Sequence, residues 1–345
     1  MLALVYHGPG KMKLEERPVP VPKDNEVLVK MKAVAVCGSD LGAYRLSEIS
    51  ERWMPPLVFG HEFAGVIEDC GKDATKYKKG TRVTANPILY CGKCFYCKRG
   101  DINYCTSRNS FGTSIGGKTT DGAMQEYFTI REEAIIPLLD GISDEEGAFL
   151  EPLACCYNSA KRGSFGEGER VLVTGAGPIG LMNVKFLKAM GAENIIVSDM
   201  VDVRLDYAKK YCAHNVINVD RQNLRDEIKR LTDGIGVDRV IITSGNHDAI
   251  PESLAMVRSG GNSVLVTITH YKVEIDPLLL VGRDVGLLGS YMFKWEQKDV
   301  MNMIAEGKLE VKDLITSTCK ISESEDVFAK LAAPGCKDVK ILITA

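Results

Sequence analysis

The sequence lacks any apolar run close to the roughly 20 residues that a membrane-spanning helix needs. It also lacks a strong charge of one sign, because 43 basic and 46 acidic residues leave a formal net charge of -3. Such a balance argues against a broad electrostatic grip on nucleic acid. The opening residues MLALVYHGPGK lack the charged start and long apolar core of a signal peptide. We therefore expect a soluble protein of the cytoplasm.

Eleven cysteines are present, a number that a secreted disulfide scaffold would also show. Because no signal peptide precedes them, we expect the thiols to be reduced. The 345 residues suit two domains, each large enough to bury its own core. No internal repeat, low-complexity tract or long linker interrupts the chain.

Short strand patterns fill the N-terminal part of the chain. Stretches rich in β-branched and apolar residues, bounded by Gly and Pro, indicate strands at 27–36, 62–70 and 122–130. Ser143 stands three residues before Glu146, and this capping box predicts a helix that leads out of the β-rich part.

A different pattern follows, in which short buried strands alternate with amphipathic helices. The helical segments include VRLDYAKKYCA and LRDEIKRLTD, and the strand patterns are RVLVT, ENIIVSD, HNVINV, VDRVIITSG, GNSVLVTI and VGLLGSY. This alternation predicts a parallel sheet with crossover helices. The last segment holds two helical stretches and a terminal strand, VKILITA, which we expect to return to the β-rich part.

A glycine motif follows the strand RVLVT and opens the helix PIGLMNVKFLKAMG. Its three glycines permit a tight turn, close approach of a pyrophosphate and close packing of helix on strand, and the phosphate charge meets the helix N-terminus. By itself the motif also fits a plain tight turn. The candidate cofactor-binding residues in it are Gly175, Gly177, Pro178, Ile179 and Gly180.

Asp199 ends the next strand pattern, about 20 residues after the glycines, where a carboxylate accepts hydrogen bonds from an adenosine ribose. Because the same carboxylate repels a 2′-phosphate, the sequence favours NAD over NADP. Arg204, on the following helix, is a candidate to stack on adenine or approach the diphosphate, or else a solvated helix residue.

Four cysteines lie close together at spacings of two, two and seven intervening residues: Cys91, Cys94, Cys97 and Cys105. Four thiolates complete the tetrahedral shell of a structural zinc ion and leave no position for a substrate. We therefore predict that a zinc ion in this lobe, at about residues 90–106, stabilises the loop and takes no part in catalysis. Disulfides or free thiols are the alternatives.

A second, scattered set of residues suits an open zinc site. Cys37 lies in VCGSD, His61 and Glu62 lie in FGHEF, and Glu151 lies in FLEPLACC. A thiolate, an imidazole and one carboxylate leave the fourth position for water or an alcohol oxygen, which a Lewis-acid zinc needs for hydride transfer. Taken singly, a buried cysteine is more often an inert core residue, and a His-Glu pair a hydrogen-bonded turn.

With these motifs the whole chain resembles the zinc-dependent medium-chain alcohol dehydrogenases, in the branch of polyol (sorbitol-like), sugar-alcohol and threonine dehydrogenases. Besides the four cysteines, the resemblance rests on CGSD at 37–40, GHE at 60–62, GTRV at 80–83, EPL at 151–153 and GAGPIG at 175–180. Glu151 departs from the version with two cysteines and one histidine, because it stands in the place of the second cysteine.

The resemblance implies a role for each residue of the open site. Cys37 and His61 are the constant zinc ligands, while Glu62 and Glu151 compete for the third place, directly or through a water, and exchange during turnover. Ser39 touches the alcohol oxygen and passes its proton outward. Asp40 either orients His61 through its other ring nitrogen or simply caps a turn.

The resemblance also implies an α/β fold that joins a GroES-like β-barrel catalytic domain to a doubly wound Rossmann sheet. The expected boundaries are 1–152 for the catalytic domain, 153–290 for the NAD-binding domain and 291–345 for a segment that returns to the first. Two zinc ions per chain, NAD, and a homodimer or homotetramer are expected. The catalytic zinc is expected in the cleft between the domains, whose closure excludes water.

The substrate pocket is expected to receive side chains from the segment after CGSD, the loop near Phe111 and the segment 289–295. Met292 occupies the place where sorbitol-type members carry an arginine, which argues against strict sorbitol recognition. The candidate ligands for an anionic group on the substrate are Arg45, Lys118 and Lys294, unless these are solvated surface bases. We expect no chemistry from the cysteine pair Cys155 and Cys156 or from His7, His214, His247 and His270.

Three functions fit these features. The first is NAD-dependent oxidation of a secondary hydroxyl of a polyol or sugar alcohol. This substrate either is uncharged or carries a phosphate or another anionic group. The second keeps the mechanism but acts on threonine or a small vicinal diol. The third is a metal-free quinone reductase-like relative, which loses the cysteine and histidine ligands that this sequence retains.

Overall fold

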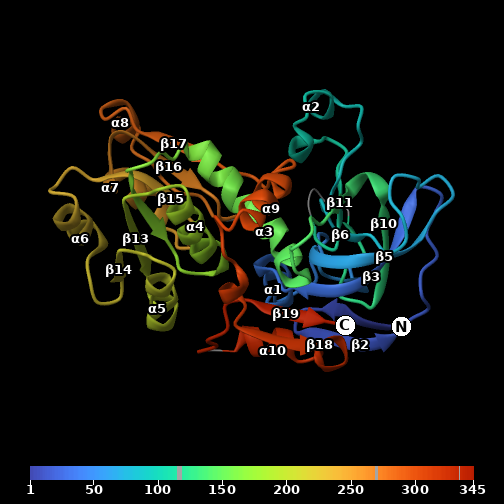
Figure 1. Ribbon diagram of the computed structural model, residues 1–345. Coiled ribbons are helices and arrows are strands. Elements are labelled where there is room, and N and C mark those ends of the chain that lie inside the picture. The colour runs from blue at the N-terminus through green and yellow to red at the C-terminus, as the bar shows by residue number, and fades with distance from the viewer. Residues whose placement is uncertain (115–118, 269–270, 334) are drawn as a thin grey trace. The chain divides into compact units, whose positions relative to one another are not determined.

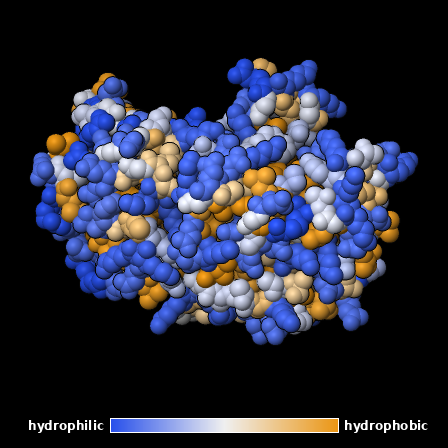
Figure 2. Space-filling view, in the orientation of Figure 1, coloured by the Kyte–Doolittle hydropathy of each residue, from blue (hydrophilic) through white to orange (hydrophobic). Residues whose placement is uncertain are grey.

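The computed structural model describes residues 1–114, 119–268, 271–333 and 335–345. Two of the residues considered above, Lys118 and His270, lie outside this range. The chain forms two compact units, the first made of Met1–Pro152 and Lys294–Ala345 and the second of Leu153–Phe293. No helix among the described residues is long and apolar enough to span a membrane. Hydrophilic residues predominate on the face shown in Figure 2.

The largest sheet of the first unit runs in the order β11-β6-β5-β3-β19-β18, and β10 also pairs with β3 (Figure 1). Most positions of β3 are buried, because it lies between neighbours and carries side chains on two covered faces. The strands are β3 (Glu26–Ala35), β5 (Glu62–Cys70), β6 (Arg82–Ala85), β10 (Tyr127–Arg131), β11 (Ile135–Pro137), β18 (Ser317–Lys320) and β19 (Ile341–Thr344).

Among the described residues, the first unit also contains two three-stranded sheets, four whole helices and the beginning of a fifth. One sheet joins β1 (Leu2–Gly8), β2 (Lys11–Glu16) and β4 (Leu57–Val58), and the other joins β7 (Ile88–Leu89), β8 (Asn109–Phe111) and β9 (Thr119–Thr120). The helices are α1 (Gly38–Tyr44), α2 (Phe95–Lys98), α9 (Gln297–Ala305) and α10 (Val327–Ala332). Four short 3-10 turns lie at Ile102–Tyr104, Glu132–Ala134, Lys312–Leu314 and Ile321–Glu323.

The expected strand at 122–130 is only half right, because β10 begins at Tyr127. The residues before it bond to several partners in turn rather than to one neighbouring strand. The amide of Met124 donates to Phe59, and its carbonyl accepts from Leu4. This segment therefore crosses from one sheet to another, which a period-two pattern cannot reveal.

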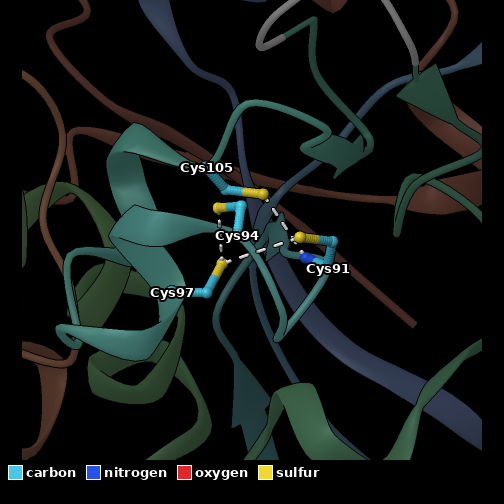
Figure 3. A group of neighbouring side chains, drawn as sticks. All are labelled: Cys91, Cys94, Cys97 and Cys105. Atoms are coloured by element: carbon cyan, nitrogen blue, oxygen red, sulfur yellow. Dashed lines mark hydrogen bonds between the residues drawn. The ribbon is translucent and has the colours of Figure 1, made fainter.

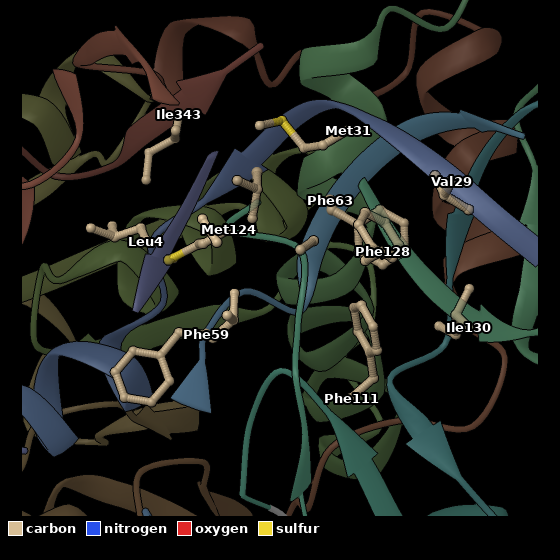
Figure 4. Packing of buried hydrophobic residues seen from close by; sticks show 14 of the residues in the cluster. Leu4, Val29, Met31, Phe59, Phe63, Phe111, Met124, Phe128, Ile130 and Ile343 are labelled. Atoms are coloured by element: carbon tan, nitrogen blue, oxygen red, sulfur yellow. The ribbon is translucent and has the colours of Figure 1, made fainter. Parts of the chain in front are cut away.

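Aromatic rings form the centre of the core of the first unit (Figure 4). The ring of Phe63 lies 4.7 Å from that of Phe128 in an edge-on arrangement, and Phe111 lies 5.2 Å from Phe128. Each fully buried ring contributes roughly 1.5–3 kcal/mol relative to an exposed one. Phe111 is only 1% exposed, so its ring supports the core, and the expectation that the loop near it contributes to a substrate pocket stays a prediction.

The second unit contains one sheet of six parallel strands, in the order β14-β13-β12-β15-β16-β17. Counted from β12, this is the 3-2-1-4-5-6 order of the doubly wound dinucleotide fold, which confirms the predicted α/β class. The strands are β12 (Arg170–Thr174), β13 (Asn194–Asp199), β14 (Asn215–Asn218), β15 (Val237–Ile242), β16 (Val257–Leu265) and β17 (Gly286–Gly289).

Among the described residues, the helices wholly within this unit are α4 (Pro178–Ala189), α5 (Asp202–Lys210), α6 (Leu224–Leu231), α7 (Ala249–Met256) and α8 (Pro277–Val281) (Figure 1), and the longer α3 (Asp144–Gly163) leads into it. The capping box that predicted α3 is confirmed, since Ser143 N donates to Glu146 at 2.8 Å and Glu146 N donates to Ser143 Oγ at 3.2 Å. The chain passes from the first unit to the second within α3, after Pro152.

Candidate metal centres and cofactor site

The open zinc site predicted from scattered residues is a compact cluster in the first unit. Cys37 follows β3 and forms the N-cap of α1, while Glu62 begins β5 and pairs with Ala35 at the end of β3. The strand pairing thus brings His61 and Glu62 beside Cys37. The potential ligand atoms of these three residues lie within 4.8 Å of one another.

Burial makes the charges of this cluster costly. His61 and Glu151 are 4% exposed, and Glu62 is 1% exposed. A buried carboxylate is tolerated only with a compensating partner. Glu151, on α3, lies outside the compact group of three but is close enough for His61 to interact with it electrostatically.

The sequence analysis missed the partner of Glu62. The ammonium of Lys340, which is only 3% exposed, forms an ion pair with the Glu62 carboxylate. Lys340 directly precedes β19, whose Leu342 pairs with Ala35, so the same strand end that carries Cys37 also receives this lysine. A lysine adjoining an otherwise apolar terminal strand is the only signal that the sequence offered, since lysine is almost never fully buried unless paired.

Asp40 lies beside the cluster and caps α1. Its carboxylate accepts a hydrogen bond from Cys37 N at 3.3 Å and one from Ser39 Oγ at 3.4 Å. It lies 3.7 Å from His61 Nδ1, which is near enough for electrostatic attraction but too long for a hydrogen bond. Of the two roles left open for Asp40, capping is therefore the one with hydrogen bonds in this structure.

The pKa values of the cluster reflect burial and mutual charge. Burial raises the pKa of Asp40 to about 6 and that of Glu151 to about 7. Burial and then Glu62 raise the pKa of the Cys37 thiol. Burial opposes the charged form of His61, but Cys37 and Asp40 outweigh it and hold the pKa well above its ordinary value.

The donor set fits a zinc ion. The buried Nδ1 of His61 has no hydrogen-bond partner among the described residues, so one ring nitrogen remains unsatisfied within the cluster of thiol and carboxyl groups. A thiolate, an imidazole and a carboxylate are the ligands that a catalytic zinc takes. A divalent cation there would also stabilise the ionised forms that burial disfavours.

The four-cysteine lobe brings its sulfur atoms together as the spacing predicted (Figure 3). Cys94 Sγ lies 3.5 Å from Cys97 Sγ, and Cys91 Sγ lies 4.0 Å from Cys97 Sγ. None of the four is in a disulfide, and hydrogen bonds from the amides of Cys97 and Thr106 lower the pKa of the Cys94 thiol to about 6. The four sulfurs fit one tetrahedral metal ion.

The glycine motif forms the turn between β12 and α4. Gly175 has a φ of +93°, and a side chain on Gly180 would meet the carbonyl oxygen of Gly175 at 1.9 Å. Gly177 has an ordinary φ of -71°, and a side chain there would meet nothing within 4 Å. The backbone thus accounts for the first and third glycines, whereas the second keeps open the space at the N-terminus of α4, where a pyrophosphate fits.

Asp199 ends β13 beside this turn. Its carboxylate accepts hydrogen bonds from Ala176 N at 2.7 Å and from Val201 N at 2.9 Å. Ala176 lies between the first two glycines, so Asp199 supports the turn, and its contact with an adenosine ribose stays a prediction. Arg204 is exposed in the first turn of α5.

Two of the cationic candidates for substrate binding are already engaged. The ammonium of Lys294 pairs with Asp101 at 2.5 Å, and Arg45 donates to the carbonyl of Leu331 at 3.0 Å. Cys156 is buried on α3, and neither it nor Cys155 is in a disulfide. His7 pairs with Glu15 and His247 with Asp248, while His214 Nδ1 accepts from Ile195 N.

Comparisons with known proteins agree with this architecture. Residues 23–140 match the alcohol dehydrogenase GroES-like domain, and residues 178–306 match the zinc-binding dehydrogenase domain. The chain is 32% identical to sorbitol dehydrogenase of Bacillus subtilis (strain 168), covering 96% of this chain and 93% of that one. It is 33% identical to L-threonine 3-dehydrogenase of Bacillus licheniformis (strain ATCC 14580), covering 97% and 96%.

A solved structure gives the same result. The NADH complex of a short chain alcohol dehydrogenase from E. coli CFT073 superposes with a TM-score of 0.92 at 27% identity, covering 100% of this chain and 99% of the other. The chain therefore belongs to the zinc-dependent medium-chain alcohol dehydrogenase family, as its motifs indicated. It is an alcohol oxidoreductase with a GroES-like domain and a Rossmann domain, so the predicted enzyme class and fold are confirmed.

Proposed function

We propose that this protein transfers a hydride between a secondary alcohol of a polyol or sugar alcohol and NAD, with a zinc ion held by Cys37, His61 and a glutamate. The buried cluster with its unsatisfied imidazole nitrogen carries the proposal, because no core role explains that combination. A zinc ion bound there supplies the Lewis acidity that stabilises the alkoxide form of the substrate. The metal-free alternative is disfavoured, since the residues it would lose are present and assembled.

The residues of this chain supply the remaining steps. Ser39 is exposed next to Cys37, and its hydroxyl donates a hydrogen bond to Asp40, so it can accept a proton from the alcohol while its own proton passes to Asp40 or to solvent. Asp40 holds the first turn of α1 and therefore the position of Cys37. Lys340 compensates the charge of Glu62 and so leaves the metal site less negative.

The choice between Glu62 and Glu151 as third ligand follows from their positions. Glu62 lies within the compact group, and we propose that it approaches the metal in the resting enzyme. Its carboxylate is shared with Lys340, however, so Glu151 remains available to replace it during turnover. This assignment keeps both carboxylates in the site, as the resemblance implies.

We propose the second unit as the NAD-binding domain and the first unit as the catalytic domain. Gly175, Gly177, Pro178, Ile179 and Gly180 would hold the pyrophosphate, and Asp199 would bind the adenosine ribose and reject a 2′-phosphate. The four cysteines would hold the second zinc ion. We further propose that the protein is cytoplasmic, where its eleven cysteines would stay reduced, and that it forms a homodimer or homotetramer.

Threonine or a small vicinal diol is the alternative substrate. The similarity to a threonine dehydrogenase supports it, because the identity nearly equals that to a sorbitol dehydrogenase. The two substrate classes share one mechanism, so only measured turnover separates them.

The test is NADH formation with polyols, phosphorylated polyols, threonine and small diols, by wild type, Cys37→Ser and Cys212→Ser. Cys212 is an exposed cysteine of the second unit and serves as the matched control. We expect one substrate group to be turned over by wild type and Cys212→Ser and not by a folded Cys37→Ser. Undiminished turnover in Cys37→Ser would refute the zinc assignment, and turnover of threonine alone would refute the polyol assignment.

A further inference from the structure

A side-chain amide on α3 holds the end of the second unit. Asn158 Nδ2 donates to the carbonyl oxygen of Met292 at 2.6 Å and to Ser290 Oγ at 3.3 Å. Met292 and Phe293 are the last residues of this unit before the chain returns to the first. None of the motifs in the sequence pointed to Asn158, because it lies seven residues after Glu151 in a continuous helix.

The carbonyl that Asn158 holds belongs to a strained residue. Met292 has a φ of +51°, in the left-handed region that residues with a side chain rarely adopt. Phe293, which follows it, is fully buried. Strain of this kind persists only where surrounding contacts enforce it, and it concentrates at functional sites. The hydrogen bond from Asn158 is one such contact, and it holds the Met292 carbonyl directly.

The position of the segment in the sheet gives it a function. Ser290 directly follows β17, and its amide donates to the carbonyl of Leu265 at the end of β16. In a sheet of this order the cofactor lies along the carboxyl ends of the strands, with one mononucleotide on each half. The glycine turn and Asp199 lie on the β12–β14 half and suit the ADP part, so the ends of β15–β17 face the nicotinamide part.

We propose that Asn158 is a positioning residue for the nicotinamide: it holds Ser290–Met292 in the strained conformation against which the ring binds. The inference rests on the proposed NAD-dependent function. It adds that Asn158 affects binding of the nicotinamide half of the cofactor and not of the ADP-ribose half. Asn158 acts through the Met292 backbone and does not touch the reacting atoms.

The test compares two ligands that differ in the nicotinamide. NADH carries both halves of the cofactor, whereas ADP-ribose carries only the half that Asp199 and the glycine turn would bind. Dissociation constants are measured by calorimetry with wild type, Asn158→Ala and Asn158→Asp, the last of which keeps the volume but cannot donate. The matched control is Asn215→Ala, which removes an amide hydrogen bond to Asn194 at the amino ends of the strands in the same unit.

We expect both Asn158 variants to bind NADH about tenfold more weakly and ADP-ribose with unchanged affinity, which corresponds to one lost hydrogen bond. Asn215→Ala should bind both ligands as wild type does. Equal weakening of both ligands would show a merely structural role for Asn158, and unchanged NADH affinity would refute the inference. Failure of wild type to bind NADH at all would instead refute the proposed function.

A second variant tests the strain directly. Glycine adopts a φ near +51° without steric cost, so Met292→Gly should depend less on the amide of Asn158. We expect the double variant Asn158→Ala/Met292→Gly to recover NADH affinity at least threefold relative to Asn158→Ala, again with ADP-ribose binding unchanged. No recovery would show that the conformation of Met292 is not what Asn158 maintains.

Discussion

The two cysteine-containing clusters of the first unit resemble each other in their candidate metal but differ in almost every other property. Four thiols from 15 consecutive residues make up one cluster, on a lobe with exposed rings such as Phe95, which is 67% exposed. The other gathers a thiol, an imidazole, carboxylates and a lysine from the ends of β3 and β5, from α3 and from the start of β19.

The difference in ligand number and burial indicates that one cluster has a structural role and the other a catalytic role. The lobe has little buried apolar surface of its own, so a metal ion with a complete shell can replace a core. The buried cluster lies beside a large core and does not need a metal to fold around. Its charges instead make the metal-free state costly and the metal-bound state reactive.

The largest expected effect separates the two clusters by activity and stability. Cys37→Ser should lower turnover on the order of a thousandfold, because it removes a ligand of the Lewis acid, while the melting temperature falls less than in Cys97→Ser. Cys97→Ser should lose one zinc ion per chain and lower the melting temperature, because the lobe loses its closed shell. Zinc analysis, calorimetry and NADH formation are measured on both variants.

The comparison breaks if the two variants behave alike. A normal melting temperature in Cys97→Ser, together with lost turnover, would assign chemistry to the lobe. Cys212→Ser, at an exposed position of the second unit, provides the baseline for a cysteine without a metal role.

The next largest effect concerns the buried lysine. Lys340→Met leaves the Glu62 carboxylate uncompensated and should destabilise the metal-free protein by about 3–5 kcal/mol. Added zinc should restore part of this loss, since the cation takes over the role of the ammonium. Urea unfolding with and without zinc measures both values, and Lys340→Arg, which keeps the charge, is the control. An equal loss in both conditions would separate Lys340 from the metal site.

How much the sequence could predict differs between the clusters for a physical reason. The four cysteines can be recognised from their spacing alone, because one loop supplies all four ligands of the candidate zinc site. The doubly wound sheet was also predictable, since each buried strand and amphipathic helix is a continuous local pattern. Cys37, His61 and Glu62 were found only because short motifs and a family resemblance marked them.

Residues that depend on pairing between distant strands escaped the sequence analysis. Lys340 comes near Glu62 because β19 and β5 both pair with β3, which no local pattern specifies. For the same reason the sequence did not show that Phe111 packs on Phe63 or that Lys294 pairs with Asp101, since both partners lie far away in the sequence. Local chemistry identifies a candidate, and only the fold shows whether it is already engaged.

A smaller effect concerns Glu151, whose burial in the catalytic cluster should make the stability of the metal-free protein depend on pH. In the metal-free protein burial raises the pKa of Glu151 to about 7, from its ordinary value of 4.5. Between these values the folded state holds a proton that the unfolded state has lost, so stability falls as pH rises. Urea midpoints of metal-free wild type and Glu151→Gln should therefore diverge over this range, with wild type losing more. Parallel pH profiles would mean that Glu151 is not buried in a low-polarity site.

The smallest expected effect concerns the glycine turn, where one substitution should affect cofactor binding and another should affect stability. Gly177→Ala should fold normally, because its side chain meets nothing within 4 Å, yet bind NADH about tenfold more weakly since the methyl group fills space meant for a phosphate. Gly180→Ala is the contrasting control and should lower the melting temperature, because its side chain would meet Gly175 O at 1.9 Å. Unchanged NADH affinity in Gly177→Ala would show that the pyrophosphate does not pass over this turn.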